Sequence, residues 1–319
     1  MRETPVLVLA YNRPEKVRAM FEQLRVLKPE RLIFNVDGPK LHIPGDAEKV
    51  AAVQDLVNLV NWTEKVETRF RAENGGLQAA VSDAVTHAVN TFGQVIVVEE
   101  DSVPGKHWFP YATTMLERYR DEKSIEHISG YNQAPTSVLR TGERGSRLTR
   151  YPASFAWATW DRAWKGFDPT LEWALNVSVT DLSSIVGSRA AALRWKQNFH
   201  DAASGRISTW AYRWLASMWS RDAWCLSPNA NLVTYTGYEG GTHTVMKAPW
   251  TEQPLFDGDL DVLLDGTPHV DPAGEKWISD TIFAGTPYGV ARGVAISAAL
   301  AARKRYRAYK REQAIRRLG

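Results

Sequence analysis

The stretch VIVVEED, residues 95–101, is a run of β-branched residues that ends on three consecutive carboxylates. Such a run is typical of a buried central strand of a parallel sheet, which meets water on neither face. The acids that follow are therefore expected where open α/β sheets bind their ligands, at the carboxyl ends of the strands. Adjacent carboxylates repel one another, and a divalent ion shared with substrate phosphates is the usual way to offset that repulsion. The alternative is a solvated strand end with ordinary surface acids.

The first hundred residues alternate between strand and helix patterns. Apolar runs and helical spacing predict strands at 5–11, 31–38, 66–70 and 95–99 and helices at 15–27, 47–60 and 77–91. Pro14 suits the first turn of a helix, where its missing N–H costs nothing. Strands that alternate with helices predict an α/β fold with a mostly parallel, right-handed, doubly wound sheet.

The pattern is looser after residue 101. The sequence predicts helices at 108–119, 157–164, 179–199 and 207–220, strands at 127–133 and 224–235, and a polar loop at 136–150. Residues 249–290 are rich in Asp, Gly and Pro, so we interpret them as an irregular connection. Residues 291–319 are predicted to form a basic amphipathic C-terminal helix.

Composition excludes several classes of protein. The one cysteine, Cys225, rules out a disulfide framework and fits a reducing compartment. The sequence holds no run of about 20 apolar residues of the kind that spans a bilayer. Its first residues read as a strand rather than as a signal peptide. We therefore expect a cytoplasmic protein.

The charge of the chain is concentrated at its end. Residues 303–319 carry eight basic residues and one acid, which is +7, whereas the net charge of the whole chain is +3. This segment suits docking on an anionic membrane surface, where each basic residue contributes about 1 kcal/mol. A solvated helix is the alternative, because charge runs usually hydrate. Nucleic acid is not expected as a partner, since no nucleic-acid-binding motif accompanies the charge.

Polar residues follow three of the predicted strands and are expected to meet at one edge of the sheet. They are Tyr11 and Arg13, then Asp37, then the three acids of residues 99–101. Asn74 precedes GGLQAA, where glycines open a helix whose N-terminal N–H groups can face an anion. The spacing is neither that of a Rossmann fingerprint nor that of a Walker loop. A cation, a ribose-reaching acid and a metal-holding acid together suit a nucleoside diphosphate.

These pieces together resemble the GT-A fold glycosyltransferases, and particularly bacterial relatives of the N-acetylglucosaminyltransferase that initiates complex N-glycans. The resemblance covers roughly residues 5–243. It is carried by the order of PVLVLAYNRPEKV, NVDG, NGGL, VVEEDSVPG, HISGYN, SFAWATWDRAW, STWAYRW and SPNANLVTYTGYEGGTH. It implies a glycosyltransferase domain over 1–248, with a nucleotide-sugar half at about 1–103 and an acceptor half at about 104–248.

The resemblance also implies roles for individual residues. Arg13 would contact the nucleobase and Asp37 the nucleoside, while Glu99 and Glu100 would hold the ribose and the donor sugar. Tyr11 and Asn74 would belong to the same nucleotide-sugar site.

For the metal, the resemblance implies that Asp101 would bind Mn²⁺, or Mg²⁺ in its place. The loop GYEGGTH would close over the diphosphate, with His243 as a second ligand. Trp157 and Trp210 are candidates for stacking on an acceptor sugar, with core packing as the alternative.

The chain departs from the family at the catalytic base. Relatives place an aspartate just before the tryptophan of STWAYRW, and this chain has Ser208 in that slot. A hydroxyl is a poor base at neutral pH. Glu239 is our first candidate to replace it, and Glu172 the second.

We therefore expect a metal-dependent glycosyltransferase that uses a nucleotide sugar, UDP-linked by the resemblance, in bacterial surface polysaccharide or glycolipid synthesis. Its acceptor would be a glycan or a lipid-linked sugar, and the enzyme would be peripheral to the membrane. Two alternatives stay open. One is a catalytically silent nucleotide-sugar-binding or scaffold protein, because the base slot is vacant. The other is a nucleotidyltransferase, although LAYNRPEK lacks the glycines that such enzymes usually carry after their first strand.

Overall fold

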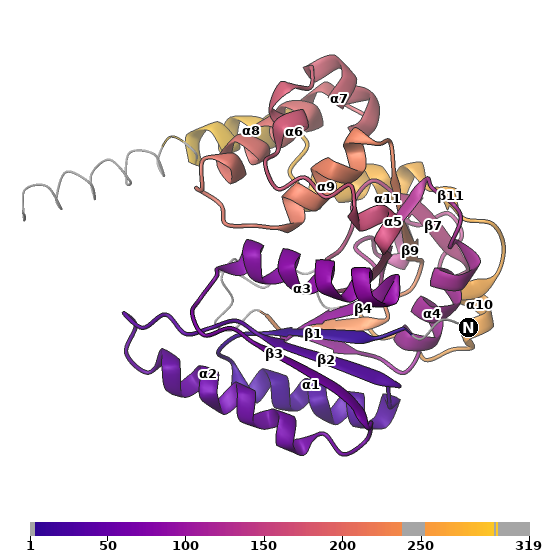
Figure 1. Cartoon of the computed structure of the whole chain (residues 1–319). Helices are drawn as coiled ribbons and strands as arrows, with labels where there is room; N and C mark the ends of the chain where they lie inside the picture. Colours follow the sequence, from indigo (N-terminus) through magenta and orange to yellow (C-terminus); the bar gives the residue numbers. More distant parts are fainter. Residues whose placement is uncertain (1–3, 238–252, 297, 299–319) are drawn as a thin grey trace, which may run out of the picture.

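The computed structural model describes residues 4–237, 253–296 and 298 of the chain (Figure 1). Its centre is a nine-stranded sheet in the order β11-β7-β9-β6-β8-β4-β1-β2-β3. The strands are β1 (Val6–Ala10), β2 (Arg31–Val36), β3 (Lys65–Phe70), β4 (Gln94–Glu99), β6 (Ile125–Ser129), β7 (Ser146–Thr149), β8 (Ala156–Trp160), β9 (Trp224–Pro228) and β11 (His269–Val270). A two-stranded sheet pairs β5 (Ser102–Pro104) with β10 (Val233–Tyr235).

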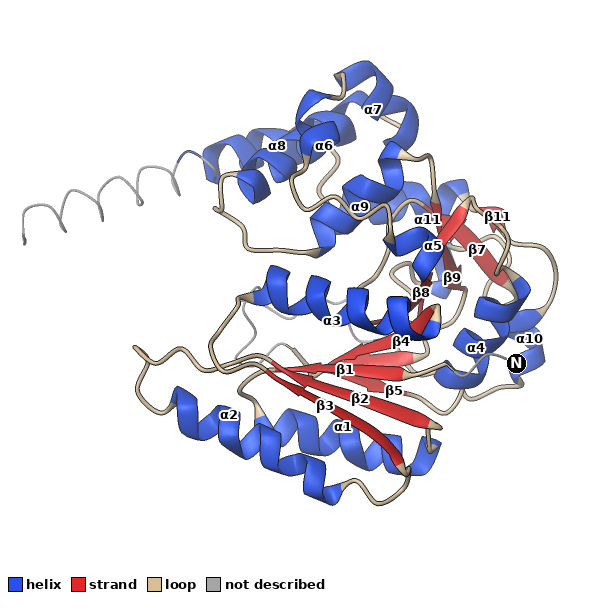
Figure 2. Cartoon of the chain, in the orientation of Figure 1, coloured by secondary structure: helices blue, strands red, loops and turns tan. Residues whose placement is uncertain are grey.

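Five of the eight pairings in the large sheet are parallel, and the antiparallel ones are β4–β8, β6–β8 and β7–β9. The predicted α/β class with a mostly parallel sheet is therefore confirmed. The three crossovers of the first half carry the helices. As Figure 2 shows, α1 (Pro14–Leu27) and α2 (Asp46–Gln54) cover one face of β1–β4, and α3 (Leu77–Phe92) covers the other.

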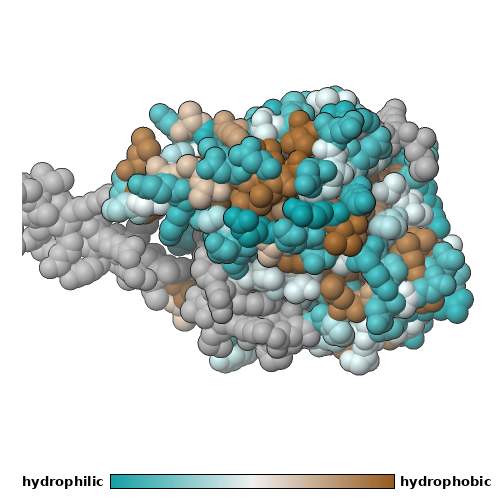
Figure 3. Space-filling view, turned by 90° about the horizontal axis from the view of Figure 1, so that it is seen from below, coloured by the Kyte–Doolittle hydropathy of each residue, from teal (hydrophilic) through white to brown (hydrophobic). Residues whose placement is uncertain are grey.

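Helix α1 shows why this half forms as the sequence predicts. Pro14 opens the helix, and its buried face is built by Val17, Met20, Phe21 and Leu24. Because these positions follow the 3.6-residue period, one stripe packs on the sheet and the rest meets water. Seen from below, the side of the molecule that carries α1 and α2 shows hydrophilic side chains with hydrophobic ones between them (Figure 3).

The remaining helices belong mostly to the second half of the chain. They are α4 (Trp108–Arg118), α5 (Asp161–Trp164), α6 (Glu172–Asn176), α7 (Val179–Val186), α8 (Arg189–Ala203), α9 (Ala211–Ser220), α10 (Leu260–Leu264) and α11 (Pro272–Trp277). Shorter turns are the 3-10 helices η1 (Asp55–Leu59) and η2 (Thr136–Val138) and the π-helix η4 (Ile278–Ile282). Helices α6–α9 lie together on the same side of the sheet as α3 (Figure 1). Within the described residues, no helix has the length and apolarity that a membrane crossing requires.

The prediction of a helix over 157–164 is wrong for its first half. Residues 156–160 form β8, which pairs antiparallel with β4 and β6, and only Asp161–Trp164 is helical. All five residues of β8 are buried. A strand that is buried on both faces shows no alternation, so its two tryptophans three residues apart imitated a helical stripe.

Other second-half expectations need smaller corrections. The predicted 179–199 helix is two helices, because Gly187 turns left-handed (φ 80°) and Ser188 caps α8. The predicted 224–235 strand is divided into β9 and β10, and the 136–150 loop contains η2 and β7. The connection 249–290 is not wholly irregular, since its described part holds α10, β11, α11 and η4. Residues 287–296 are helical, and the basic segment 303–319 lies outside the described residues.

Candidate functional site

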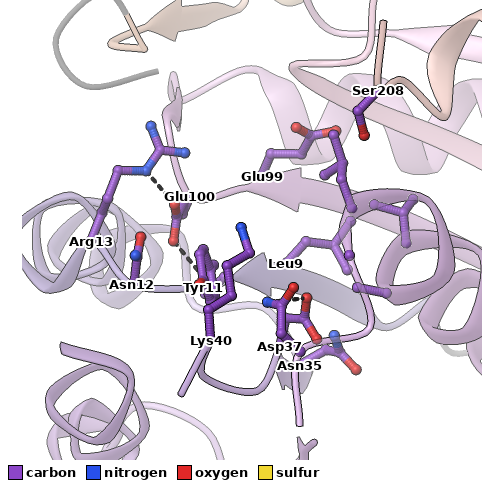
Figure 4. Close-up of a pocket in the computed structure, with 16 residues that line it drawn as sticks. Leu9, Tyr11, Asn12, Arg13, Asn35, Asp37, Lys40, Glu99, Glu100 and Ser208 are labelled. Carbon is purple, nitrogen blue, oxygen red and sulfur yellow. Dashed lines mark hydrogen bonds and ion pairs between the residues drawn. The ribbon is translucent and has the colours of Figure 1, made fainter. Parts of the chain in front are cut away.

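A cleft of about 480 Å³ opens at the carboxyl ends of β1, β2 and β4 (Figure 4). The structure brings all six predicted nucleotide-sugar residues together in its wall, namely Tyr11, Arg13, Asp37, Asn74, Glu99 and Glu100. Asn12 and Gly76, from the predicted strand end and helix start, also line the cleft, and residues that the sequence did not single out complete it: Leu9, Ala10, Asn35, Lys40, Leu77, Ala80 and Val81. Ser208, the vacant base position, also lines the cleft. The parallel strand ends place these side chains together, as expected for open α/β sheets.

Arg13 joins two of the three consecutive acids. Its Nε donates to Glu100, and its Nη2 lies 3.3 Å from Oδ2 of Asp101. Tyr11 adds its backbone N–H to the second oxygen of Glu100, at 2.7 Å. Burial raises the pKa of Glu100, and the Arg13 charge and the Tyr11 N–H offset part of that rise. This ion cluster keeps two strand ends, β1 and β4, in a fixed relation.

Asp37 connects the end of β2 to the start of α3. Its Oδ1 accepts the N–H groups of Gly38 and Gly75, both at 2.9 Å, and its Oδ2 accepts the amide of Asn74 at 2.9 Å. Gly38 is required here, because a Cβ at this position would lie 2.3 Å from the carbonyl carbon of Glu73. The loop before α3 is therefore held on Asp37 through Asn74 and the Gly75 N–H.

The Asp46 carboxylate also holds residues of the site in place, and the sequence analysis did not identify it. It is buried in the first turn of α2 and accepts the Tyr11 hydroxyl, the Asn12 amide and the Lys40 backbone N–H. Burial would raise the pKa of Asp46, but these hydrogen bonds lower it below its usual value. The partners lie 6 to 35 residues away in sequence, and the segment IPGDAE carries no known signature, so no local signal could have identified them.

Glu99 belongs to both the cleft and an aromatic stack. Nε1 of Trp210 donates to its Oε1 at 3.2 Å. Burial raises the pKa of Glu99 well above its ordinary value, and the neighbouring Asp101 carboxylate adds to that rise. The Trp210 ring stacks on Trp157 at 5.1 Å, and Trp157 stacks on His127 at 5.1 Å. Because Trp157 is fully buried and Trp210 is 3% exposed, both rings pack in the core and neither offers a platform on the surface.

Asp101 sits where β4 passes into β5. Its backbone carbonyl accepts the N–H and the hydroxyl of Thr236, at 2.8 and 3.0 Å. Thr236 immediately follows β10, so the chain returns to Asp101 just before residue 238, the first residue outside the described part of the chain. Glu239 and His243, predicted as base and metal ligand, lie outside the described residues. Glu172 is exposed on α6 and does not line the cleft.

The chemistry of the donor set tests whether a metal suits this place. The described residues contain no group of three or more His, Cys, Asp or Glu side chains arranged around a metal. Asp101 does not itself line the cleft, but it contacts Arg13, which does, and its side chain is 12% exposed. One carboxylate with substrate phosphates is how Mg²⁺-type ions are commonly held. The residues therefore fit a metal bridged to a substrate and do not fit a cage built by the protein alone.

Comparisons with known proteins give distant likenesses only. No protein-family profile matches the chain, and no curated protein does. A mannosyltransferase from Pyrobaculum calidifontis, solved with GDP-Man and Mn²⁺, is 14% identical, with 97% of this chain and 83% of that one covered and a TM-score of 0.38. TarS 1–349 of S. aureus is 13% identical (68% and 71% covered, TM-score 0.38). The galactosyltransferase LgtC, solved with donor and acceptor sugar analogs, is 9% identical (68% and 70%, TM-score 0.36).

Proposed function

We propose that this protein is a glycosyltransferase of GT-A type that transfers a sugar from a nucleotide-sugar donor to a glycan or lipid-linked acceptor. One observation carries the proposal. Aromatic, cationic and acidic side chains from the ends of three parallel strands converge on one cleft of about 480 Å³. Cofactor and substrate pockets commonly measure about 300–1,000 Å³ and lie at such strand ends. The distant structural likenesses add no weight to this argument.

We propose that different residues of the cleft bind the nucleoside and the sugar of the donor. We assign Arg13, Asp37 and Asn74 to the nucleoside, and Glu99 and Glu100 to the ribose and donor sugar, as the family resemblance implies. All five line the cleft, and three hydrogen bonds orient Asp37. Fixed hydrogen-bonding groups of this kind hold a substrate without reorganisation.

Asp101 would hold Mn²⁺, or Mg²⁺. The metal, when bound, would supply charge neutralisation for the departing nucleoside diphosphate. Arg13 remains beside Asp101 and limits the mutual repulsion of the acids around that position.

We infer the donor and setting from the family resemblance. A UDP-sugar such as UDP-N-acetylglucosamine is the first choice of donor, and bacterial surface polysaccharide or glycolipid the product. The +7 segment of residues 303–319 would bring a cytoplasmic enzyme to the anionic inner face of the membrane.

A serine in place of a carboxylate at position 208 favours a second candidate function. Ser208 lines the cleft, as Figure 4 shows, and by the resemblance it occupies the position of the relatives' catalytic acid. A site that binds a nucleotide sugar without a base could serve a catalytically silent binding or scaffold protein.

The experiment that tests the proposal measures binding and turnover separately. A thermal-shift panel of nucleotide sugars, with and without Mn²⁺, should raise the melting temperature for at least one donor. With that donor and a panel of octyl glycosides, a transferase releases free nucleoside diphosphate and a silent binder does not. If no nucleotide sugar stabilises the protein, both candidate functions fail.

Variants of Ser208 test whether the missing catalytic acid limits turnover. General-base assistance typically contributes on the order of 10²–10⁴-fold. Ser208→Asp should therefore raise turnover, whereas Ser208→Ala should leave it unchanged. Equal turnover in both variants would show that the acceptor does not approach Ser208.

A further inference from the structure

Lys40 is a cation in the cleft that neither a motif nor a resemblance assigns to a role. It lies in the loop between β2 and α2, and it lines the cleft together with Arg13 as its second cation. Its Nζ is 5.2 Å from the centre of the Tyr11 ring. In Figure 4 the Lys40 side chain rises from the cleft wall past Tyr11, with Glu99 and Ser208 across the opening.

The two cations differ in their partners. Arg13 is engaged by Glu100 and Asp101, so most of its charge is already matched. Lys40 makes no ion pair with a carboxylate among the described residues, although its charge helps to lower the pKa of Asp46, and it is half-buried. A lysine whose only partner is water gains little from a half-buried position, because its ammonium group is strongly hydrated in free solution.

The loop holds Lys40 in place through its backbone. The Lys40 N–H donates to Oδ2 of Asp46 at 2.7 Å, and the same carboxylate accepts the Tyr11 hydroxyl and the Asn12 amide. Asp46 is only 3% exposed. One buried carboxylate therefore ties the loop that carries Lys40 to the end of β1, and it fixes the ring over which the ammonium lies.

Charge balance indicates what Lys40 would bind. Asp37, Glu99 and Glu100 line the cleft with Asp101 beside them, so a phosphate-bearing ligand enters a site rich in negative charge. Such a ligand needs a cation that is not already neutralised, in addition to any metal. Lysine is a usual point-charge partner for phosphate.

We propose that Lys40 binds the phosphate groups of the nucleotide ligand and that Asp46 is the positioning residue that presents it. This inference rests on the proposed function, because it assumes that the cleft takes a nucleotide. The alternative is a structural Lys40, whose contact with Tyr11 only stabilises the loop.

The test separates the phosphate from the rest of the nucleotide. The nucleoside diphosphate of the donor that stabilises the parent protein is titrated by calorimetry, alongside its own nucleoside, into the parent, Lys40→Met and Lys49→Met. Lys49 is an exposed lysine on α2 outside the cleft, and it serves as the matched control. Charge-assisted hydrogen bonds of this kind predict a roughly 10- to 100-fold loss of diphosphate affinity in Lys40→Met. Nucleoside affinity should stay within about 2-fold, and Lys49→Met should bind like the parent.

Two results would overturn the inference while leaving the proposed function intact. In one, Lys40→Met binds the diphosphate as tightly as the parent. In the other, diphosphate and nucleoside affinities fall by the same factor, which would mean that Lys40 only shapes the loop. A parent protein that no nucleotide sugar of the thermal-shift panel stabilises would instead refute the proposed function, and this inference with it.

A double-mutant cycle tests the part assigned to Asp46. If Asp46 acts by presenting Lys40, then Asp46→Asn should weaken diphosphate binding in the parent but add little to Lys40→Met. Fully additive losses would overturn the positioning role. The nucleoside titration is the internal check, because a general collapse of the loop would lower nucleoside affinity in Asp46→Asn as well.

Discussion

Two regions of the molecule, the sheet half around β1, β2 and β4 and the helical half of α6–α9, have cores of different side chains. The sheet of β1, β2 and β4 has an aliphatic core, and its polar residues gather at the strand ends that form the cleft. Helices α6–α9 pack instead around an aromatic cluster centred on Trp195, with Phe199, Trp219 and Phe283 at ring-centre distances of 4.8–5.4 Å. The aliphatic half holds chemical groups at strand ends, whereas the aromatic half fills space between short helices. The stack of Trp210, Trp157 and His127 packs with the core of the sheet, and Glu99 accepts the indole N–H of Trp210 at one end of it.

The largest expected effect on stability tests the aromatic half. Trp195→Ala removes a fully buried ring and should lower the free energy of unfolding by about 3–5 kcal/mol. Leu193→Ala, on the partly exposed face of the same helix, should change it by about 0.5 kcal/mol or less. Urea unfolding measures both. If Trp195→Ala costs less than Leu193→Ala, the cluster is not the core of this half.

The strand-end acids should matter for binding rather than for folding. Asp101→Asn removes the carboxylate proposed to hold the metal, and Mn²⁺-dependent affinity for a nucleotide sugar should fall on the order of 10²-fold or more. The far-UV spectrum and the melting temperature should stay near those of the parent. Asp121→Asn, at an exposed turn, is the control. Calorimetry that gives equal affinities for Asp101→Asn and the parent, with Mn²⁺ present, would remove Asp101 from the site.

The contrast between the halves also explains what could be predicted from the sequence. In the first half, apolar runs and period-3.6 patterns alternate cleanly, and of the polar residues predicted after the strands only Asp101 is not in the cleft wall. In the second half, the buried strand β8 carries Trp157 and Trp160 at a helical spacing, and short helices replace a long one. Buried segments with aromatic side chains lose the contrast between faces on which such predictions depend.

Within the site, the residues missed are those whose role depends on distant partners. Asp46 bonds Tyr11 across 35 residues, and Lys40 gains its place only through Asp46. Neither stands directly after a strand, so neither carries the local signal that identified Arg13, Asp37 and Asp101. Trp157 and Trp210 were predicted to stack on an acceptor, with core packing as the alternative, and their burial favours the core packing.

The pH dependence of folding stability tests whether His127, at one end of the stack, is buried in its neutral form. Burial lowers the pKa of His127 to about 3 from 6.5, while Ala153 O and Trp214 Nε1–H occupy its two nitrogens. Between pH 6.5 and 3 the unfolded chain binds a proton that the folded chain does not, so folding stability is full above pH 6.5 and falls below it. One pKa unit is 1.36 kcal/mol, so the loss is about 2 kcal/mol at pH 5.

His127→Gln should remove this dependence. The fall in unfolding free energy between pH 7.5 and 5 should be smaller in His127→Gln than in the parent by about 2 kcal/mol. The exposed His42→Gln is the control and should follow the parent. Parallel pH profiles for His127→Gln and the parent would mean that His127 titrates normally in the folded protein.

The smallest expected effect asks whether the aromatic stack serves the cleft. Trp210→Phe keeps a ring on Trp157 but removes the N–H that Glu99 accepts, so donor affinity or turnover should fall by about 2- to 10-fold, the usual worth of one hydrogen bond. Trp214→Phe is a matched control one turn further along α9, because its indole N–H donates to His127 rather than to Glu99. Both variants lose one hydrogen bond in the same core cluster, so their melting temperatures should fall by similar amounts, whereas only Trp210→Phe should change donor kinetics. If the two variants alter donor kinetics equally, the Trp210 N–H has no specific effect on Glu99, and the stack joins the two halves only as packing.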